Sequence, residues 1–289
     1  MSKSKILLQL DSDAQASVFD AVVALDAGID HLLSHGSIEV SQVRDLVYGA
    51  MFTRGGDDLR STAIFIGGSD VSRGEALLAQ AQRTFFGPVR VSVMLDSNGA
   101  NTTAAAAVLA AAKHTPMANA DAVVLAATGP VGSRVVRLLA MEGASVRVAS
   151  RNRARAEAVC QAVAAKISGA RLTPVETASP AQTEAALKDA QIVIAAGAPG
   201  IELLSAKTRV ECKTLQVAID LSAVPPAGLA GVEATDKAKM RENVACYGAI
   251  GVGGMKMKIH KAAIQQLFTA NDQVLDAEEI YRIAQSLGG

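Results

Sequence analysis

Short apolar runs alternate with helical patterns along almost the whole chain, and this alternation limits the possible folds more than any other feature. The runs KILLQL, STAIFIG and VRVSVML are each followed by a stretch whose apolar residues recur with helical spacing. Successive parallel strands need a crossover, usually a helix, so this order predicts parallel sheets covered by helices. The expected fold class is therefore α/β.

A polar segment with a proline, KHTPMANAD, separates this series from a second one. Strands of the second series are expected in DAVVLAA, ASVRVAS, RLTPVE, QIVIAAG and LQVAIDL. Two further helices follow a glycine run near the end of the chain, and that run is expected to act as a hinge leading back to the first domain. The sequence thus predicts two domains, residues 1–113 plus 253–289 and residues 114–252, with a cleft between them.

Composition excludes several classes of protein. Half of the 289 residues are apolar, 19% are charged and the formal net charge is zero, so neither a nucleic-acid partner nor a membrane surface is indicated. No apolar run is long enough to span a membrane, and the chain is expected to be cytoplasmic. The three cysteines, Cys160, Cys212 and Cys246, are widely separated and the four histidines are dispersed, so no metal site is expected.

The stretch VVLAATGPVG predicts a strand, a tight turn and the start of a helix. Such a turn offers backbone N–H groups and the positive end of the helix dipole to a pyrophosphate. The dinucleotide fingerprint GxGxxG is present except that Ala127 replaces its first glycine. The alternative is an ordinary strand–turn–helix connection. The residues predicted to bind the cofactor here are Thr128, Gly129, Pro130, Val131 and Gly132, with Gly197 and Gly253 further along the chain.

The end of the next strand indicates which dinucleotide binds. NAD-specific folds carry an Asp or Glu at this position, whereas this chain has Ser150 followed by Arg151 and, one turn on, Arg155. Guanidinium groups suit a 2′-phosphate through charge-assisted hydrogen bonds. The alternative is a solvated basic helix start. NADP is the expected cofactor, with NAD as a second one.

Polar side chains also cluster where the strand VRVSVML ends. Asn98, Thr102 and Thr103 belong to more polar groups than one helix cap requires, and ligands of open α/β sheets bind at such strand ends. The alternative for each is ordinary capping. Near the C-terminus, Lys256 and His260 lie one helical turn apart on an apolar face. Either Lys256 reaches the edge and His260 bonds a carbonyl, or both contact a ligand.

The chain resembles the NADP-dependent methylene-tetrahydromethanopterin dehydrogenases of methylotrophic bacteria, some of which also accept methylene-tetrahydrofolate. The segments that carry the resemblance are VFDAVVALDAG, STAIFIGG, MLDSNGANTTAAA, TGPVG, GAIGVGGMKMKIHKA and DAEEIYRIA, in this order along the chain. The resemblance implies a pterin domain formed by the N-terminal part and the C-terminal helices, with a Rossmann-type NADP domain between them. It also implies a homo-oligomer, expected to be a trimer.

The resemblance further implies roles for individual residues. Asp20, Thr102, Lys256 and His260 would line the pterin side, with Asp20, Lys256 and His260 as the catalytic set. The reaction would pass a hydride from methylene-tetrahydromethanopterin to NADP in one-carbon metabolism. Two alternatives are a methylene-tetrahydrofolate dehydrogenase and an NADPH-binding sensor without catalysis.

Overall fold

The computed structural model describes residues 3–288 and separates into two compact units. The first unit holds the residues up to Thr102 and from Met257 onward, and the second holds Thr103–Lys256. The division falls inside helices α4 (Ala100–Ala112) and α9 (Ala249–Gln266), whereas the sequence suggested boundaries near residues 113 and 253. The assignment of a pterin domain and a cofactor domain to these units stays a prediction.

The first unit is built on a five-stranded parallel sheet with the strand order β2-β1-β3-β4-β12. The strand order reverses between β1 and β3, and doubly wound sheets bind ligands at the carboxyl ends of the strands at such a reversal. The elements of this unit, besides parts of α4 and α9, are β1 (Ile6–Leu10), α1 (Val18–Asp26), β2 (His31–His35), α2 (Val40–Phe52), the 3-10 helix η1 (Gly56–Ser61), β3 (Thr62–Ile66), α3 (Val71–Thr84), β4 (Ser92–Leu95), the 3-10 helix η2 (Ser97–Gly99), β12 (Val274–Leu275) and α10 (Ala277–Leu287).

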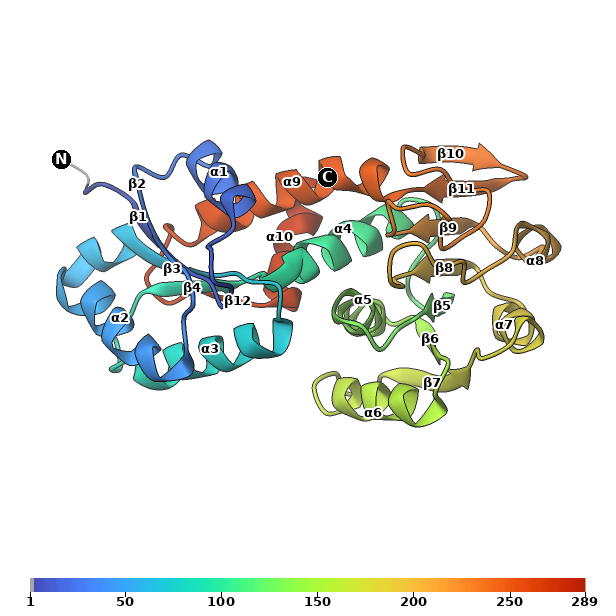
Figure 1. The fold of residues 1–289 in the computed structure, drawn as a ribbon, viewed down its shortest axis with the longest axis horizontal. Helices are drawn as coiled ribbons and strands as arrows, with labels where there is room; N and C mark the ends of the chain where they lie inside the picture. Colours follow the sequence, from blue (N-terminus) through green and yellow to red (C-terminus); the bar gives the residue numbers. More distant parts are fainter. Residues whose placement is uncertain (1–2, 289) are drawn as a thin grey trace. The chain divides into compact units, whose positions relative to one another are not determined.

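Successive side chains of β3 point to opposite faces of the sheet, and each face is covered by helices. Ile64 and Ile66 are buried in a core with Val43 of α2 and Leu77 of α3. Phe65 points to the opposite face, because successive side chains of a strand alternate, and it contacts α9 there. Figure 1 shows α2 and α3 on one side of this sheet and α1 and α9 on the other.

The second unit is built on a seven-stranded sheet with the order β10-β11-β9-β8-β5-β6-β7, in which β10 alone runs antiparallel to its neighbour. Counted from β5, this is the strand order of the dinucleotide-binding fold with an added edge strand. Its elements, besides parts of α4 and α9, are β5 (Asp121–Leu125), α5 (Pro130–Met141), β6 (Ser145–Ser150), α6 (Arg153–Ala164), β7 (Arg171–Glu176), α7 (Pro180–Leu187), β8 (Ile192–Ala195), α8 (Ala206–Glu211), β9 (Val217–Asp220), β10 (Lys237–Arg241) and β11 (Val244–Tyr247).

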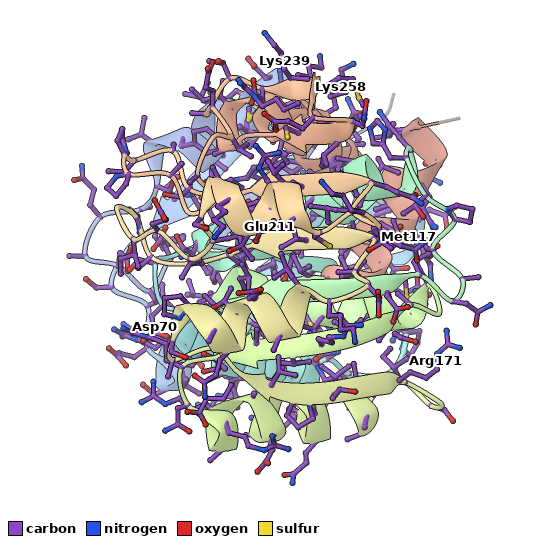
Figure 2. All side chains as sticks on the ribbon, turned by 90° about the vertical axis from the view of Figure 1, so that its right-hand side faces the viewer. Asp70, Met117, Arg171, Glu211, Lys239 and Lys258 are labelled. Atoms are coloured by element: carbon purple, nitrogen blue, oxygen red, sulfur yellow. The ribbon has the colours of Figure 1, made fainter. Side chains whose placement is uncertain are left out.

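Helices cover both faces of this second sheet, with α5 and α6 on one side and α7 and α8 on the other (Figure 1). Exposed basic side chains mark its two edge strands: Lys239 projects from β10 and Arg171 lies at β7 (Figure 2). Charged edges discourage pairing with further strands. The α/β class with parallel sheets, expected from the sequence, is confirmed.

Two expectations from the sequence were wrong. The strands expected from the sequence did not include residues 31–35, but these residues form β2, so His31 and His35 terminate an edge strand. The glycine run was expected to be a hinge, yet Gly251 and Gly253 lie inside α9. A Cβ at Gly251 would come within 1.8 Å of the Asp236 carbonyl oxygen, so this glycine is needed for close packing of the helix against a neighbouring loop.

No helix of the described residues is long and apolar enough to cross a membrane. Within residues 3–288 no group of three or more His, Cys, Asp or Glu side chains is placed to hold a metal ion.

Candidate functional site

The turn between β5 and α5 leaves the first helical turn accessible. Gly129 is the N-cap of α5 and Pro130 is its first residue. A Cβ at Gly129 would make only ordinary van der Waals contacts, at 3.8 Å, with the carbonyl oxygens of Ala126 and Ala196. Glycine has no side chain to cap the helix, so the backbone N–H groups of this turn and the positive end of the helix dipole stay available to a ligand. The turn can therefore receive a phosphate group.

Gly132 has a different purpose in the same turn. A Cβ there would lie 2.8 Å from both the Ala126 carbonyl oxygen and the Ala127 Cα, so α5 packs against the end of β5 at a distance that only glycine permits. Ala126 adopts a left-handed φ of 53°, and the Ala127 N–H donates to the Ala149 carbonyl at 2.9 Å. The turn thus forms although alanine replaces the first glycine of the fingerprint.

A pocket of about 550 Å³ opens beside this turn, within the volume range of small-molecule sites. It lies where β5, β6, β7 and β8 end, at the edge of the sheet that binds ligands in such folds. Its wall includes five of the residues predicted from the sequence: Thr128, Ser150, Arg151, Arg155 and Gly197. Residues 129–132 lead from this wall into α5.

The end of β6 supplies the cationic part of the wall. The Asn152 side chain caps α6 by accepting the Arg155 N–H at 3.2 Å, and the buried Ser150 hydroxyl accepts the Asn152 N–H at 3.2 Å. Arg153 instead forms an ion pair with Glu157 at 3.0 Å. Arg151 and Arg155 are exposed at the pocket. Two guanidinium groups beside an open helix N-terminus fit a dinucleotide with an additional phosphate.

A second wall of this pocket was not identified from the sequence. Thr177, Ser179 and Pro180 follow β7, and Ile201 and Leu203 follow β8. Ser179 and Gln182 form a capping box at α7, and the spacing SPAQ could have revealed it. Ile201 is 43% exposed and offers apolar surface to a flat ring, but only the strand order brings it here, so no local pattern could have indicated it.

In the first unit, side chains gather at the carboxyl end of β3. A Cβ at Gly67 would lie 3.2 Å from Phe65 Cε1 and 3.6 Å from Asp20 Oδ2. The Phe65 ring stacks on the imidazole of His260, with centroids 5.5 Å apart and planes inclined by 25°. His260 is 1% exposed and Asp20 is half-buried. Asp20 and the Phe65 ring that stacks on His260 are thereby both close to Gly67.

The predicted polar residues after β4 have different surroundings. Thr102 is fully buried, and its hydroxyl donates to Asp96 Oδ2 at 2.6 Å. Asp96 also accepts the backbone N–H groups of Asn101 and Thr102, so it caps α4. Asn98 is exposed with a left-handed φ of 56°, and Thr103 is half-buried. A ligand role for Asn98, Thr102 and Thr103 stays a prediction.

Lys256 and Gly253, the other predicted residues on α9, are half-buried. Lys256 lies one turn before His260 along the helix. On the same helix, Lys258 is exposed and Lys261 forms an ion pair with Asp26 at 2.8 Å.

Three titratable groups of the second unit lie outside the pocket. Burial raises the pKa of the Asp220 carboxyl, which accepts N–H groups from Ser222 and Leu229 at 3.0 Å. The His114 Nε2 lies 2.8 Å from the Tyr247 hydroxyl. Burial lowers the pKa of His114 and raises the pKa of Tyr247, so both side chains favour their neutral forms.

Known proteins resemble this chain along its full length. Residues 18–98 match the family model of the N-terminal part of methylene-tetrahydromethanopterin dehydrogenase. The bifunctional protein MdtA of Methylorubrum extorquens is 44% identical over 289 residues, which cover 99% of this chain and 100% of that protein. The NAD(P)-dependent methylenetetrahydromethanopterin dehydrogenase of the same organism is 28% identical over 98% of this chain and 99% of its own length.

Solved structures agree on the fold. Shikimate 5-dehydrogenase of Listeria monocytogenes matches with a TM-score of 0.53 at 13% identity, over 98% of this chain and 96% of that one. Quinate dehydrogenase of Corynebacterium glutamicum matches with a TM-score of 0.51 at 13% identity, over 98% and 99%. At these identities the likeness concerns the fold alone. The sequence match to MdtA goes further, and by it the chain belongs to the methylene-tetrahydromethanopterin dehydrogenase family.

Proposed function

We propose that this protein is an NADP-dependent methylene-tetrahydromethanopterin dehydrogenase. It transfers a hydride reversibly from methylene-tetrahydromethanopterin to NADP and yields the methenyl derivative and NADPH. The 44% identity to a family member over the whole chain carries this proposal. The pocket at the ends of β5–β8 supports the cofactor part, and the relative named as NAD(P)-dependent supports NAD as a second cofactor.

Bound NADP would supply the nicotinamide ring that accepts the hydride. Different residues of the pocket would bind different parts of NADP. Residues 129–132 and the dipole of α5 would bind the pyrophosphate, through backbone N–H groups other than that of Pro130, which has none. Arg151 and Arg155 bind the 2′-phosphate through charge-assisted hydrogen bonds, and the Ser150 hydroxyl holds the turn between them and the sheet. Ile201 and Leu203 provide the apolar surface for the adenine.

The reaction requires the protein to orient the two substrates more than to transfer a proton. The hydride leaves a carbon placed between two nitrogens, and these nitrogens stabilise the cation that forms. No general base is required. The two substrates must meet at near-attack distance, and we propose that the first unit binds the pterin and the second unit binds NADP.

The predicted catalytic residues serve this orientation. Asp20 offsets the positive charge that develops on the substrate. Lys256 and His260 fix polar atoms of the pterin, because a cation placed next to the forming cation would oppose the reaction. The closeness of Asp20 to the Phe65–His260 stack around Gly67 supports a shared site for Asp20 and His260.

An absorbance assay of nicotinamide reduction tests the proposal. Methylene-tetrahydromethanopterin and methylene-tetrahydrofolate are each offered with NADP and with NAD under anaerobic conditions. The highest kcat/KM is expected for the methanopterin derivative with NADP. A higher kcat/KM with the folate would assign the protein to folate metabolism. NADPH binding without turnover in any of the four pairings would indicate a sensor.

The family resemblance also leads us to propose a homo-oligomer, expected to be a trimer. Light scattering coupled to gel filtration would then give three times the chain mass of 29.7 kDa. A mass equal to one chain would contradict it. A cytoplasmic location stays a prediction.

A further inference from the structure

We infer that Phe65 is a positioning residue of this reaction, which acts through His260, and that Gly67 leaves room for the Phe65 ring beside it. This inference rests on the proposed function, since it concerns the surroundings of two residues assigned to the pterin.

Phe65 has a rigid location in the sheet. It belongs to β3, the central strand, where it pairs with Gln9 of β1 and Met94 of β4. The side chain is 2% exposed. Its neighbours Ile64 and Ile66 fill the core shared with α2 and α3, whereas Phe65 points to the other face. A group fixed by a central strand orients its partner more precisely than a loop residue does.

The geometry of the ring pair indicates why the side chain is aromatic. The Phe65 and His260 rings are nearly parallel, at 25°, with centroids 5.5 Å apart. Offset stacking of this kind favours one orientation of the imidazole plane. A leucine would occupy the same region without imposing that plane. The direction in which the ring nitrogens of His260 point is therefore set in part by Phe65.

Gly67 links the stack to Asp20. A Cβ at this position would lie 3.2 Å from Phe65 Cε1, 3.2 Å from Asp11 Oδ2 and 3.6 Å from Asp20 Oδ2. Asp11 has little freedom to move, because its carboxylate accepts the N–H groups of Asp13 at 2.9 Å and Ser17 at 3.0 Å. The distance to Asp20 is an ordinary contact, whereas the distances to Asp11 and Phe65 are tight, so an added methyl group would shift the Phe65 ring.

The first test is Phe65→Leu, with Phe268→Leu as the matched control. Phe268 is a half-buried phenylalanine of the same unit that contacts the Lys5 ammonium. Phe65→Leu should raise the KM for methylene-tetrahydromethanopterin about three- to tenfold, in line with the strength of aromatic pairs, and leave the KM for NADP unchanged. The NMR signal of the His260 ring should shift. The control should change none of these.

The NMR measurement needs no turnover, so it separates the two claims. If neither pterin substrate supports NADP reduction by the wild-type protein, the proposed function fails. The His260 signal still reports whether Phe65 orients the imidazole. A folded Phe65→Leu protein with wild-type KM values and an unchanged His260 signal would overturn the inference.

A second test is available if the Phe65→Leu protein folds poorly. Gly67→Ala should lower kcat/KM for the pterin several-fold at an unchanged NADP affinity. Its control is Gly49→Ala on the exposed face of α2, where a Cβ meets nothing within 4 Å. Equal kcat/KM for the pterin in the two alanine variants would contradict the part assigned to Gly67.

Discussion

Arg151 and Arg153 are two residues apart in the sequence, but only Arg151 lines the pocket of the second unit. Arg153 is held by Glu157 in an ion pair at 3.0 Å. Basic residues that are neighbours in the sequence can therefore have different functions. Here Arg151 lies before α6, and Arg153 is the first residue of that helix. The two side chains form a natural pair for a test of cofactor selectivity.

Arg151→Ala should raise the KM for NADP about 10- to 100-fold, the loss expected when a charge-assisted hydrogen bond to the 2′-phosphate is removed. The KM for NAD should change little, because NAD lacks that phosphate. Steady-state kinetics with both cofactors measure the two effects. Arg153→Ala is the control and should keep the wild-type values. An equal rise for NAD and NADP would place Arg151 elsewhere on the cofactor.

Lys256→Ala should raise the KM for the pterin at least as much as it lowers kcat, because an orienting contact acts in both the ground state and the transition state. The exposed Lys258, on the same helix, supplies the control Lys258→Ala. Initial rates over a range of pterin concentrations distinguish the two parameters. A fall in kcat at an unchanged KM would mean that Lys256 stabilises only the transition state.

Site residues that belong to one continuous segment could be predicted from the sequence better than site residues that several distant segments bring together. Ser150 and Arg151 could be predicted because strand, turn and helix follow one another within a few residues. Ile201 and Phe65 could not, because their positions depend on the strand order and on which face of a sheet each side chain takes. Thr102 was predicted to contact a ligand, and its buried hydroxyl is bonded to Asp96.

At the scale of single elements, the two glycines of the β5–α5 turn have separate tasks. Gly132 permits close contact between helix and strand, whereas a Cβ at Gly129 would meet only ordinary contacts at the helix start. One fingerprint therefore combines a requirement of folding with a requirement of binding. Substitution by alanine should distinguish these requirements.

Gly132→Ala should lower the free energy of unfolding by about 1–3 kcal/mol, because its Cβ would overlap the backbone of Ala126 and Ala127. Gly129→Ala should keep the wild-type stability and weaken NADPH binding several-fold, because its methyl group enters space meant for the pyrophosphate. Chemical denaturation and fluorescence titration with NADPH measure the two quantities. Gly129→Ala with wild-type NADPH affinity would contradict the assignment of this turn.

Elements whose residues follow a regular pattern were predicted with nearly correct limits, and α9 was not. Its glycines suggested a hinge, but the helix begins at Ala249 and includes them. Gly251 lies against the backbone of Asp236, which a sequence cannot show, since that contact joins segments from separate elements. Glycine spacing alone therefore does not distinguish a flexible segment from a closely packed helix.

At the scale of the whole molecule, buried titratable groups connect stability to pH. His114 and Tyr247 lie in segments far apart in the sequence, and their side chains join in one hydrogen bond of the second unit. Burial is the largest cause of the lowered pKa of His114. The folded protein consequently binds a proton at this site less readily than the unfolded chain does.

Lowering the pH from 7.5 through 6.5 should therefore reduce the free energy of unfolding, because in this window the unfolded state gains more protons than the folded state. The loss should be smaller in His114→Asn. Urea denaturation at pH 7.5 and 5.5 measures the difference. The exposed His31, in His31→Gln, serves as the control and should keep the wild-type dependence. An identical pH dependence in wild type and His114→Asn would exclude His114 as its source.

The α/β class followed from the alternation along the chain, and the structure confirms it, although β2, β10 and β12 were not expected from the sequence. The strand orders of the two sheets could not be predicted, because they depend on crossovers that bring distant segments together. The division of work between the two units stays a prediction.

The proposed reaction is a direct hydride transfer from the methylene carbon of the pterin to C4 of the nicotinamide. Methylene-tetrahydromethanopterin carrying two deuterium atoms on its methylene carbon is mixed with the protein and NADP in ordinary water, and the NADPH formed is examined by mass spectrometry and NMR. One deuterium is expected at C4 of the nicotinamide in every NADPH molecule, beside the hydrogen already present in NADP. NADPH without deuterium at C4 would contradict direct transfer.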